Sequence, residues 1–322
     1  MVSEYDAWEH ICADAFDDLR TGIVVLLTAY FDATDDPTVK GRPDRPLLHG
    51  VGCYLAYRDD WKRVRREWKA ELDKKGLRYF HATDFEWALN QVINDRELPK
   101  DNPYCGWKRE EFVEFQKRLY RVLNRKRHKQ EGAYRLAAFC SSVHKIEFDA
   151  NLPAELKDDP ECQSYYIFNV ANTMKQIAWW CNRHFPLYQR NPIHYIFANG
   201  DNEGGNLEKW FNLLWQDPGD RYYFRLHKGY SRIGYDLQWM ESEPALQAAD
   251  VVAFELGKVG VEVTVRGAAD IPFDELRRSL PVLFQAPGFG TTLTGSELIA
   301  AFNQIIARRK MPKADPASLP PL

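Results

Sequence analysis

The sequence predicts an α/β protein in which helices flank a mixed β-sheet. Apolar segments of strand length alternate with longer segments whose apolar residues recur at helical spacing. The first two predicted strands are joined by a polar connection rich in Asp, Pro and Gly, which is typical of a hairpin and argues against an all-parallel sheet. There is no internal repeat, and no shift in composition marks a second domain. We therefore expect one domain with elaborations.

Each predicted element rests on the spacing of its apolar residues. Predicted strands are runs of aliphatic and aromatic residues bounded by polar turns, at residues 22–32, 49–57, 133–143, 194–198 and 222–226. Predicted helices place apolar side chains every three or four residues, at residues 5–20, 61–75, 109–129, 160–184, 207–215 and 246–254. A short extended segment is expected at residues 78–85. A last helix is expected to open at Thr294 and Glu297, which have the spacing of a capping box.

These elements suggest how the chain is divided. Residues 1–21 are expected to form a helical extension, and residues 22–257 the main domain. Residues 258–311 are expected to form a C-terminal elaboration packed on the same domain. Residues 312–322 contain several prolines and are expected to form a disordered tail.

Bulk composition places the chain among ordinary globular proteins. It has 322 residues, of which 45% are hydrophobic, and it contains no apolar run of about 18 residues. The N-terminus lacks the basic and then apolar order of a signal peptide. We therefore expect a soluble, cytoplasmic protein without a membrane partner. The six cysteines form no C-x-x-C pair, which argues against a zinc knuckle and a secreted disulfide framework.

Charge restricts how a nucleic acid could be held. The net charge of −3 exerts no overall attraction on a polyanion, so binding would need local basic patches. The predicted helix at 61–75 has basic residues on its outer faces, including Arg63, Arg65 and Arg66, and a basic run follows at 125–129. These residues either contact a phosphate backbone or form an ordinary solvated surface.

One aspartate stands in a predicted helix that is otherwise apolar. Asp250 lies among small and aliphatic residues in Leu246–Phe254, where an unpaired carboxylate would cost several kcal/mol. It therefore needs a cation, an Arg or hydrogen-bond donors nearby. A second aspartate, Asp32, ends the most apolar predicted strand. Together they indicate a metal site, and the alternative is that Asp250 caps or bridges backbone groups.

Further polar residues follow other predicted strands. Asp201 and Glu203 lie in a Gly-rich turn after the strand at 194–198, and strand ends line the crevice where α/β sheets bind ligands. Carboxylates from separate elements suit Mg²⁺ or Mn²⁺, and such ions act on phosphate esters. His81 with Asp84 could supply a ligand, a proton shuttle or an ordinary loop pair. Asp201 could equally shape a turn.

Several other chemistries are excluded by the absence of their motifs. The chain has no Gly-x-x-x-x-Gly-Lys loop, no Gly-x-Ser-x-Gly elbow and no His-Glu-x-x-His. The acidic turn lacks the spaced ligands and distal Glu of an EF-hand. NTPase, α/β-hydrolase, zincin and EF-hand functions are therefore not expected.

The order of these segments resembles the family called DUF3800. The matching pieces are the strand ending in Asp32, the segment Phe80–Asp84, the Gly200-Asp201 turn and the helix Leu246–Ala253. The resemblance covers residues 22–257 and implies a ribonuclease H-like fold. It assigns the first-strand acid to Asp32, the His/Asp loop to His81 and Asp84, and the helix acid to Asp250.

The chain departs from this family at two places. Where members often end the first strand in Asp-Glu-Ser-Gly, this chain has Asp32-Ala33-Thr34-Asp35, so Asp35 or Asp36 would have to replace the glutamate. Where members often place an acid before the Gly-Asp turn, this chain has Ala198, so Asp201 or Glu203 would have to supply that ligand. Without a substitute for these acids, the protein would bind its substrate without cleaving it.

These observations lead to three hypotheses about function. The first is a Mg²⁺- or Mn²⁺-dependent phosphodiesterase, specifically a nuclease acting on RNA or DNA, with Asp32, Asp201, Glu203 and Asp250 as metal ligands. The second is an inactive module of the same fold that binds nucleic acid or a protein partner. The third is an enzyme acting on a small phosphorylated substrate, because the same metal chemistry serves both kinds of ester.

Overall fold

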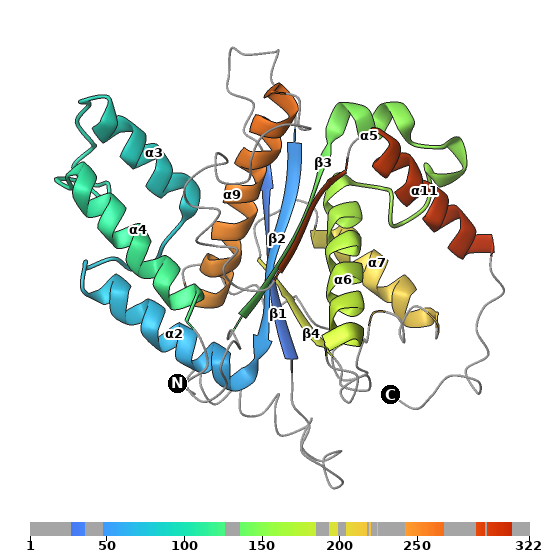
Figure 1. Ribbon diagram of the computed structural model, residues 1–322, viewed down its shortest axis with the longest axis horizontal. Coiled ribbons are helices and arrows are strands. Elements are labelled where there is room, and N and C mark those ends of the chain that lie inside the picture. The colour runs from blue at the N-terminus through green and yellow to red at the C-terminus, as the bar shows by residue number, and fades with distance from the viewer. Residues whose placement is uncertain are drawn as a thin grey trace, which may run out of the picture.

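The computed structural model centres on a five-stranded mixed β-sheet with the strand order β4-β1-β2-β3-β5 (Figure 1). It describes residues 27–35, 48–125, 136–184, 193–198, 204–217, 219, 224, 242–266, 288–293 and 295–310. The strands are β1 (Leu27–Asp35), β2 (Leu48–Tyr57), β3 (Leu136–His144), β4 (Ile193–Phe197) and β5 (Gly288–Leu293). β1, β2 and β3 pair antiparallel, β4 pairs parallel to β1, and β5 pairs parallel to β3. The predicted α/β class with a mixed sheet is confirmed.

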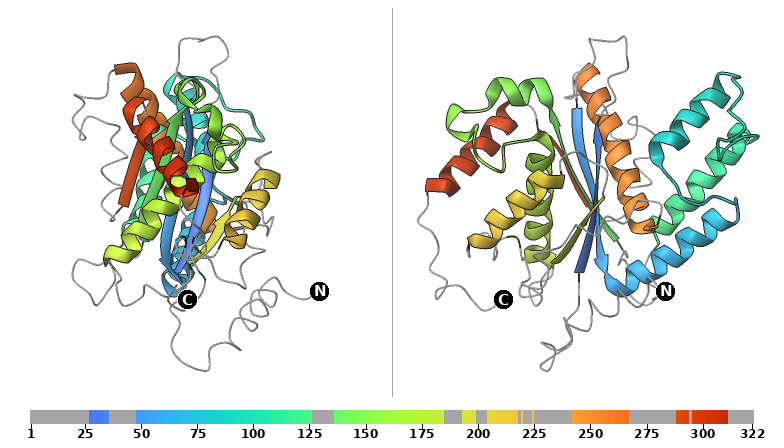
Figure 2. Two further views of the ribbon diagram at one scale, coloured as in Figure 1. Left: turned by 90° about the vertical axis from the view of Figure 1, so that its right-hand side faces the viewer. Right: turned by 180° about the vertical axis from the view of Figure 1, so that it is seen from behind.

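Helices cover both faces of the sheet (Figure 2). One face carries α9 (Pro244–Arg266), and farther out lie α2 (Arg58–Asp73), α3 (Ala82–Ile93) and α4 (Arg109–Leu123). The other face carries α6 (Tyr165–His184) and α7 (Gly204–Gln216), with α5 (Lys145–Asn151), a 3₁₀ helix (Ala154–Leu156) and α11 (Gly295–Lys310) alongside. Among the described residues, no helix is both long and apolar enough to cross a membrane.

Both sides of the strands are buried, which explains why they read as continuous apolar runs. Along β1, Leu27, Ala29 and Phe31 belong to the core that includes α6, whereas Tyr30 belongs to the core that includes α9. Successive side chains of a strand point to opposite faces. Asp32 follows Tyr30 by two residues and therefore lies on the α9 face.

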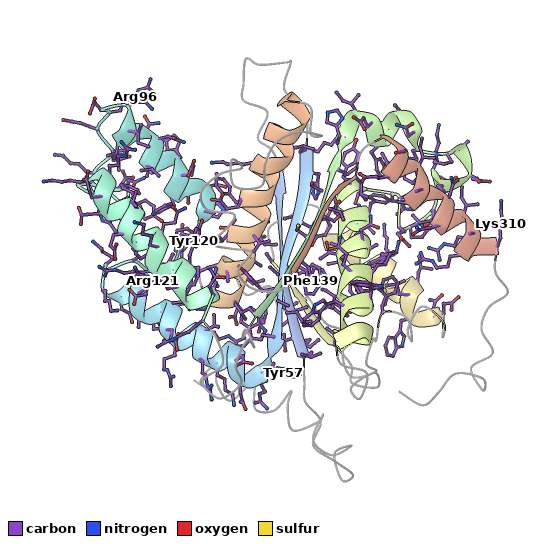
Figure 3. All side chains as sticks on the ribbon, in the orientation of Figure 1. Tyr57, Arg96, Tyr120, Arg121, Phe139 and Lys310 are labelled. Atoms are coloured by element: carbon purple, nitrogen blue, oxygen red, sulfur yellow. The ribbon has the colours of Figure 1, made fainter. Side chains whose placement is uncertain are left out.

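The helix predicted at residues 61–75 is confirmed as α2, and it packs against both α4 and α9. Trp61 of α2 is buried, and its indole Nε1 donates to the carbonyl oxygen of Thr28 at 2.9 Å. From α4, the Tyr120 hydroxyl donates to Oε1 of Glu255 on α9 at 3.3 Å (Figure 3). Polar atoms of large aromatic residues therefore connect the outer helices to the sheet and to α9.

Most of the other predicted elements are also present where the structure describes them. The strands at 49–57, 133–143 and 194–198 correspond to β2, β3 and β4. The helices at 109–129, 160–184 and 207–215 correspond to α4, α6 and α7. The helix at 246–254 is longer than predicted, because α9 runs from Pro244 to Arg266.

Other expectations need correction or lie outside the described residues. The extended segment at 78–85 is wrong in its second half, because Ala82–Phe85 form the first turn of α3. Neither α5, with seven residues, nor β5, which begins Gly-Phe-Gly, has the periodic apolar pattern that would predict it. The boundary placed after residue 257 falls within α9, and β5 joins the common sheet. The expected features at 5–20, 22–26, 312–322, Thr294 and most of 222–226 lie outside the described residues.

A buried ion network attaches α11 to the segment that precedes α6. Glu161 is fully buried, and it accepts hydrogen bonds from Lys175 Nζ at 2.5 Å and from the Arg308 guanidinium. Burial raises the pKa of Glu161, but the charges of Lys175 and Arg308 outweigh this effect and lower the pKa to about 2. Arg309 adds a bond from Nε to Asp159 at 2.7 Å. The carboxylate therefore remains ionised inside the protein.

α9 lies directly against β2 at Gly52. A Cβ atom added to Gly52 would lie 2.2 Å from the backbone nitrogen of Ala253 and 2.7 Å from its Cα, far inside van der Waals contact. Only glycine therefore allows the helix backbone to approach this closely. Gly52 is also the cross-strand partner of Asp32. The contact consequently places α9 beside the strand position that carries Asp32.

We expect Gly52→Ala to destabilise the protein by about 1–3 kcal/mol or more, because the added methyl group must push α9 away from β2. Urea denaturation measures this change. Gly76→Ala is the matched control: it adds a methyl group where nothing lies within 4 Å, and it carries only the backbone cost of a φ of +66°. A Gly52→Ala protein no less stable than the Gly76→Ala protein would contradict the close approach.

Candidate functional site

Two carboxyl groups from distant parts of the sequence meet between β1 and α9. Asp32 on β1 is 7% exposed, and Asp250 in the second turn of α9 is 3% exposed. Their side chains are joined by a hydrogen bond. Such a bond between two carboxyl groups requires a proton on one of them. The convergence expected from the sequence is therefore present, whereas metal binding by these residues stays a prediction.

Asp250 also holds the start of α3. Its Oδ2 accepts a hydrogen bond from the backbone N–H of Ala82 at 2.6 Å. Ala82 is the first residue of α3, and the N-cap residue His81 makes no side-chain capping bond. Asp250 thus accepts, from another helix, one of the N–H groups in the first turn of α3 that have no acceptor within the helix, and the positive end of the helix favours its charge. This bond to one backbone N–H agrees with the alternative expectation that Asp250 caps or bridges backbone groups.

His81 and Asp84 form a pair at the beginning of α3. Nδ1 of His81 lies 3.1 Å from Oδ2 of Asp84. The hydrogen bond to Asp84 raises the pKa of His81, burial opposes this effect, and the charges of Asp250 and Asp84 add to the rise. The same hydrogen bond lowers the pKa of Asp84. The two side chains are therefore poised as an imidazolium and a carboxylate beside the Asp32–Asp250 pair.

Burial controls the protonation of Asp250. Removal from water raises its pKa to about 6. The charge of His81, the N–H of Ala82 and the bond to Asp32 each act in the opposite direction, and the charge of Asp84 adds to the rise. Asp250 therefore binds its proton more tightly than an exposed aspartate, chiefly because it is buried.

The remaining predicted ligands are not placed by the described residues. Asp201 and Glu203 lie outside them, as does Asp36, and the side chain of Asp35 is not described. Ala198 is described, and its N–H donates to the carbonyl oxygen of Phe31 at 2.9 Å. The chain therefore leaves β4 directly beside the residue that precedes Asp32. Asp201 and Glu203 follow three and five residues later in the sequence and stay predicted ligands.

The described residues do not by themselves form a complete metal shell. Within the described part of the chain, no group of three or more His, Cys, Asp or Glu side chains is arranged to hold a metal ion. Asp32 and Asp250 are two oxygen-ligand residues, and Mg²⁺ also takes waters and substrate oxygens as ligands. A cation held here would need such additional ligands.

Two residues that shape the site are not singled out by the sequence patterns. Gly52 permits the contact between β2 and α9, and Gln247 lies one turn before Asp250 on the same helix. A glycine inside a strand is a signal of close backbone approach. A buried glutamine three residues before a buried aspartate signals a shared helix face. Neither signal identifies the residue against which Gly52 or Gln247 packs.

The basic surface of α2 differs from the prediction at one position. Arg63 and Arg66 are exposed, as expected. Arg65 is not part of this surface: its Nε donates to Oε1 of Glu243 at 2.7 Å, and its guanidinium also contacts the Tyr30 hydroxyl. Arg125 forms an ion pair with Glu67 at 2.9 Å, and the rest of the basic run lies outside the described residues.

The raised pKa of Asp250 predicts a specific pH dependence of stability. A carboxyl group whose pKa is higher in the folded chain stabilises the fold fully below its unfolded pKa, near 3.8, and this contribution is lost as the pH rises through about 6. Asp250→Asn removes the loss, because the amide can donate to Asp32 and still accept from Ala82. Between pH 4 and pH 7 the variant should gain stability relative to wild type by on the order of 2–3 kcal/mol.

Urea denaturation in EDTA at several pH values measures this difference. Asp59→Asn, which neutralises an exposed carboxylate on α2, is the control and should follow the wild-type profile. Parallel pH profiles for Asp250→Asn and wild type would show that Asp250 carries no extra proton in the folded protein.

Comparisons with known proteins do not add an assignment to this geometry. No family model matches the chain, and neither curated proteins nor solved structures give a significant match. The resemblance to DUF3800 therefore stays a prediction carried by Asp32, His81, Asp84 and Asp250.

Proposed function

We propose that the protein is a divalent-metal-dependent phosphodiesterase, specifically a nuclease with a ribonuclease H-like fold. The observation that carries this proposal is the buried, hydrogen-bonded pair of carboxyl groups formed by Asp32 and Asp250. Such a pair costs stability at neutral pH, because burial opposes ionisation. A bound cation would offset that cost, because it would be held by the two ionised carboxylates.

The sheet is compatible with the proposed fold. It begins with the antiparallel strands β1, β2 and β3 and then adds β4 parallel to β1. The carboxyl ends of β1 and β4 consequently lie at the same edge of the sheet. In α/β proteins, ligands bind in the crevice at such ends. Contrary to the sequence prediction, Asp32 is not the last residue of its strand, because β1 continues to Asp35. It lies one residue beyond the last β1 position paired with β4, where a nuclease of this kind would hold its substrate.

The donor atoms fit Mg²⁺ or Mn²⁺. Carboxylate oxygens are the ligands that these hard cations prefer. Asp32 and Asp250 would hold the ion, with Asp201 or Glu203 as further ligands. When bound, the ion would lower the pKa of a coordinated water and neutralise charge on the phosphate. Asp32 and Asp250 must give up their shared proton to bind it.

His81 and Asp84 are the groups in this site that can move a proton. Asp84 lies against Nδ1 of His81, which orients the imidazole and stabilises its protonated form. Nε2 is then the atom through which His81 would exchange a proton with water or with a leaving oxygen. Asp84 would act on the reaction only through His81. Substitution of His81 would therefore remove the group that transfers the proton, whereas substitution of Asp84 would remove only the partner that orients it.

One observation favours the inactive binding module as the second candidate. Asp250 already has a hydrogen-bond donor in Ala82 and a carboxyl partner in Asp32, so its burial has a structural explanation without a metal. In that case the exposed basic residues of α2 would hold nucleic acid, or another surface would hold a protein partner, without cleavage. Metal binding separates the two candidates.

Wild-type protein should bind Mn²⁺ and cleave nucleic acid only when the ion is present. Asp32→Asn and Asp250→Asn should each weaken Mn²⁺ binding by about 100-fold or more and abolish cleavage, because a ligand oxygen loses its charge. Calorimetric titration with Mn²⁺ measures binding. Fluorescent single-stranded RNA, single-stranded DNA, their duplexes and a hybrid measure cleavage.

Asp59→Asn is the matched control, since it removes an exposed aspartate from α2 and should change neither quantity. Hydrolysis of a small aryl phosphodiester without cleavage of any nucleic acid would favour the third hypothesis, an enzyme that acts on a small phosphorylated substrate. Wild-type protein that binds no Mn²⁺ but retains nucleic acid would favour the inactive module.

The exposed arginines of α2 provide a separate test of nucleic-acid binding. If Arg63 and Arg66 contact phosphates, then Arg63→Glu with Arg66→Glu should weaken binding and reduce the slope of log affinity against log salt by about one to two units. Fluorescence anisotropy between 50 and about 300 mM salt measures both quantities.

Lys157→Glu with Lys310→Glu makes the same charge change at two exposed lysines that follow the 3₁₀ helix and end α11, far from α2 (Figure 3), and should leave the salt slope closer to wild type. An equal effect of both double variants would assign the change to net charge. No effect of the α2 variant would show that its basic surface is only solvated.

A further inference from the structure

We infer that Gln247 is a positioning residue for the proposed site and acts by fixing the backbone of Phe80, the residue before His81. Gln247 lies on α9 one turn before Asp250 and is 1% exposed. Its Oε1 accepts hydrogen bonds from the backbone N–H of Phe80 at 3.0 Å and from Trp68 Nε1 at 2.9 Å. The meaning of this contact for catalysis rests on the proposed function.

Gln247 and Asp250 together hold two alternate amides of one segment. Gln247 binds the N–H of Phe80, and Asp250 binds the N–H of Ala82. His81 lies between them in an extended conformation, with φ −132° and ψ 122°. In an extended chain, alternate N–H groups point to the same side, and residues three apart on a helix share a face. The turn Gln247–Asp250 is therefore matched to the spacing of Phe80–Ala82.

The second bond of Gln247 makes this attachment rigid. Trp68 is fully buried in α2, and its indole ring packs against Phe80 with ring centroids 6.0 Å apart. Gln247 thus joins α9, α2 and the segment that leads into α3 through one oxygen atom. An amide oxygen with two buried donors has little freedom to move. The position of Phe80 is consequently defined by both helices.

Fixing Phe80 matters because His81 must face two acids at once. Its Nδ1 meets Asp84 at 3.1 Å, and the charge of Asp250 acts on the same ring. Asp250 alone would hold only the residue after His81. Without Gln247 the N–H of Phe80 would lose its acceptor, and only ring packing would hold the residue before His81. Shifts of about 1 Å in a catalytic group can lower turnover by about 100-fold. We assign Gln247 no contact with the metal ion or with the substrate.

Three variants test the inference. Gln247→Met keeps the length of the side chain but removes the acceptor oxygen. Gln247→Glu keeps an acceptor oxygen at the same place, and burial beside Asp250 favours the uncharged form of the new carboxyl group, so this variant is the conservative rescue. Trp68→Phe keeps an aromatic ring but removes one of the two donors, so it should give a weaker effect in the same direction. Gln176→Met is the matched control, because it removes a glutamine hydrogen bond, to Thr291, from a helix on the opposite face of the sheet.

The readouts are amide hydrogen exchange of Phe80 and Ala82, Mn²⁺ affinity, and kcat and KM for nucleic-acid cleavage. Gln247→Met should speed exchange at Phe80 by about tenfold or more, and it should lower kcat by about 10- to 100-fold with KM and Mn²⁺ affinity unchanged. Gln247→Glu should restore most of the protection and of kcat. Gln176→Met should match wild type in every readout.

Two outcomes would overturn the inference. Exchange at Phe80 that is unchanged in Gln247→Met would show that Gln247 does not fix this segment. A loss of thermal stability with kcat intact would give Gln247 a purely structural role. If wild type neither binds Mn²⁺ nor cleaves nucleic acid, the proposed function fails by itself, and the exchange measurements still decide whether Gln247 holds the backbone beside His81.

Discussion

The contact between the backbone of α9 and Gly52 is the constraint on which the rest of the site depends. A helix normally stands off a sheet by the thickness of the side chains between them. At Gly52 there is no side chain, and Ala253 of α9 lies where a Cβ atom would be. Because Asp32 is the cross-strand neighbour of Gly52, the approach that this glycine permits also brings Asp250 within hydrogen-bond reach of Asp32. The carboxyl pair and the start of α3 follow from that one contact.

In the Asp32–Asp250 pair, the protonation state that favours folding stability is the one that would oppose cation binding. Burial favours the protonated pair, and a cation favours the ionised pair, so proton and metal compete for the same oxygens. The N–H of Ala82 and the charge of His81 both act on the side of the ionised form, which reduces the cost of releasing the proton. Preorganised partners of this kind are the means by which proteins keep acids close together at neutral pH. Under the proposed function, the pair would therefore lower the stability of the metal-free fold and gain affinity for a cation in return.

The strands, the long helices and the two central acids can be predicted because each depends on local patterns. β1 is a run of apolar residues, and Asp250 is a single charge in an apolar helix, so both are visible in the sequence. α3 is not visible, because its first turn is capped by Asp250 from a remote helix and not by a residue of its own segment. Arg65 lies at the flank of the buried stripe of α2, where helical periodicity cannot decide between water and the partners Glu243 and Tyr30. The partners of Gln247 likewise depend on tertiary packing.

The buried carboxylate of Glu161 has a consequence for the order in which the chain can fold during synthesis. Its cationic partners are Lys175, close by in the sequence, and Arg308, which lies 147 residues later. Until the ribosome has released Arg308, Glu161 cannot be fully buried without leaving part of its charge uncompensated, which is strongly unfavourable. The segment around Glu161 must therefore wait for the last helix, whereas the packing of α9 on the sheet needs no residue of α11. Co-translational folding of this protein should accordingly complete the contacts of α9 with the sheet before those of α11.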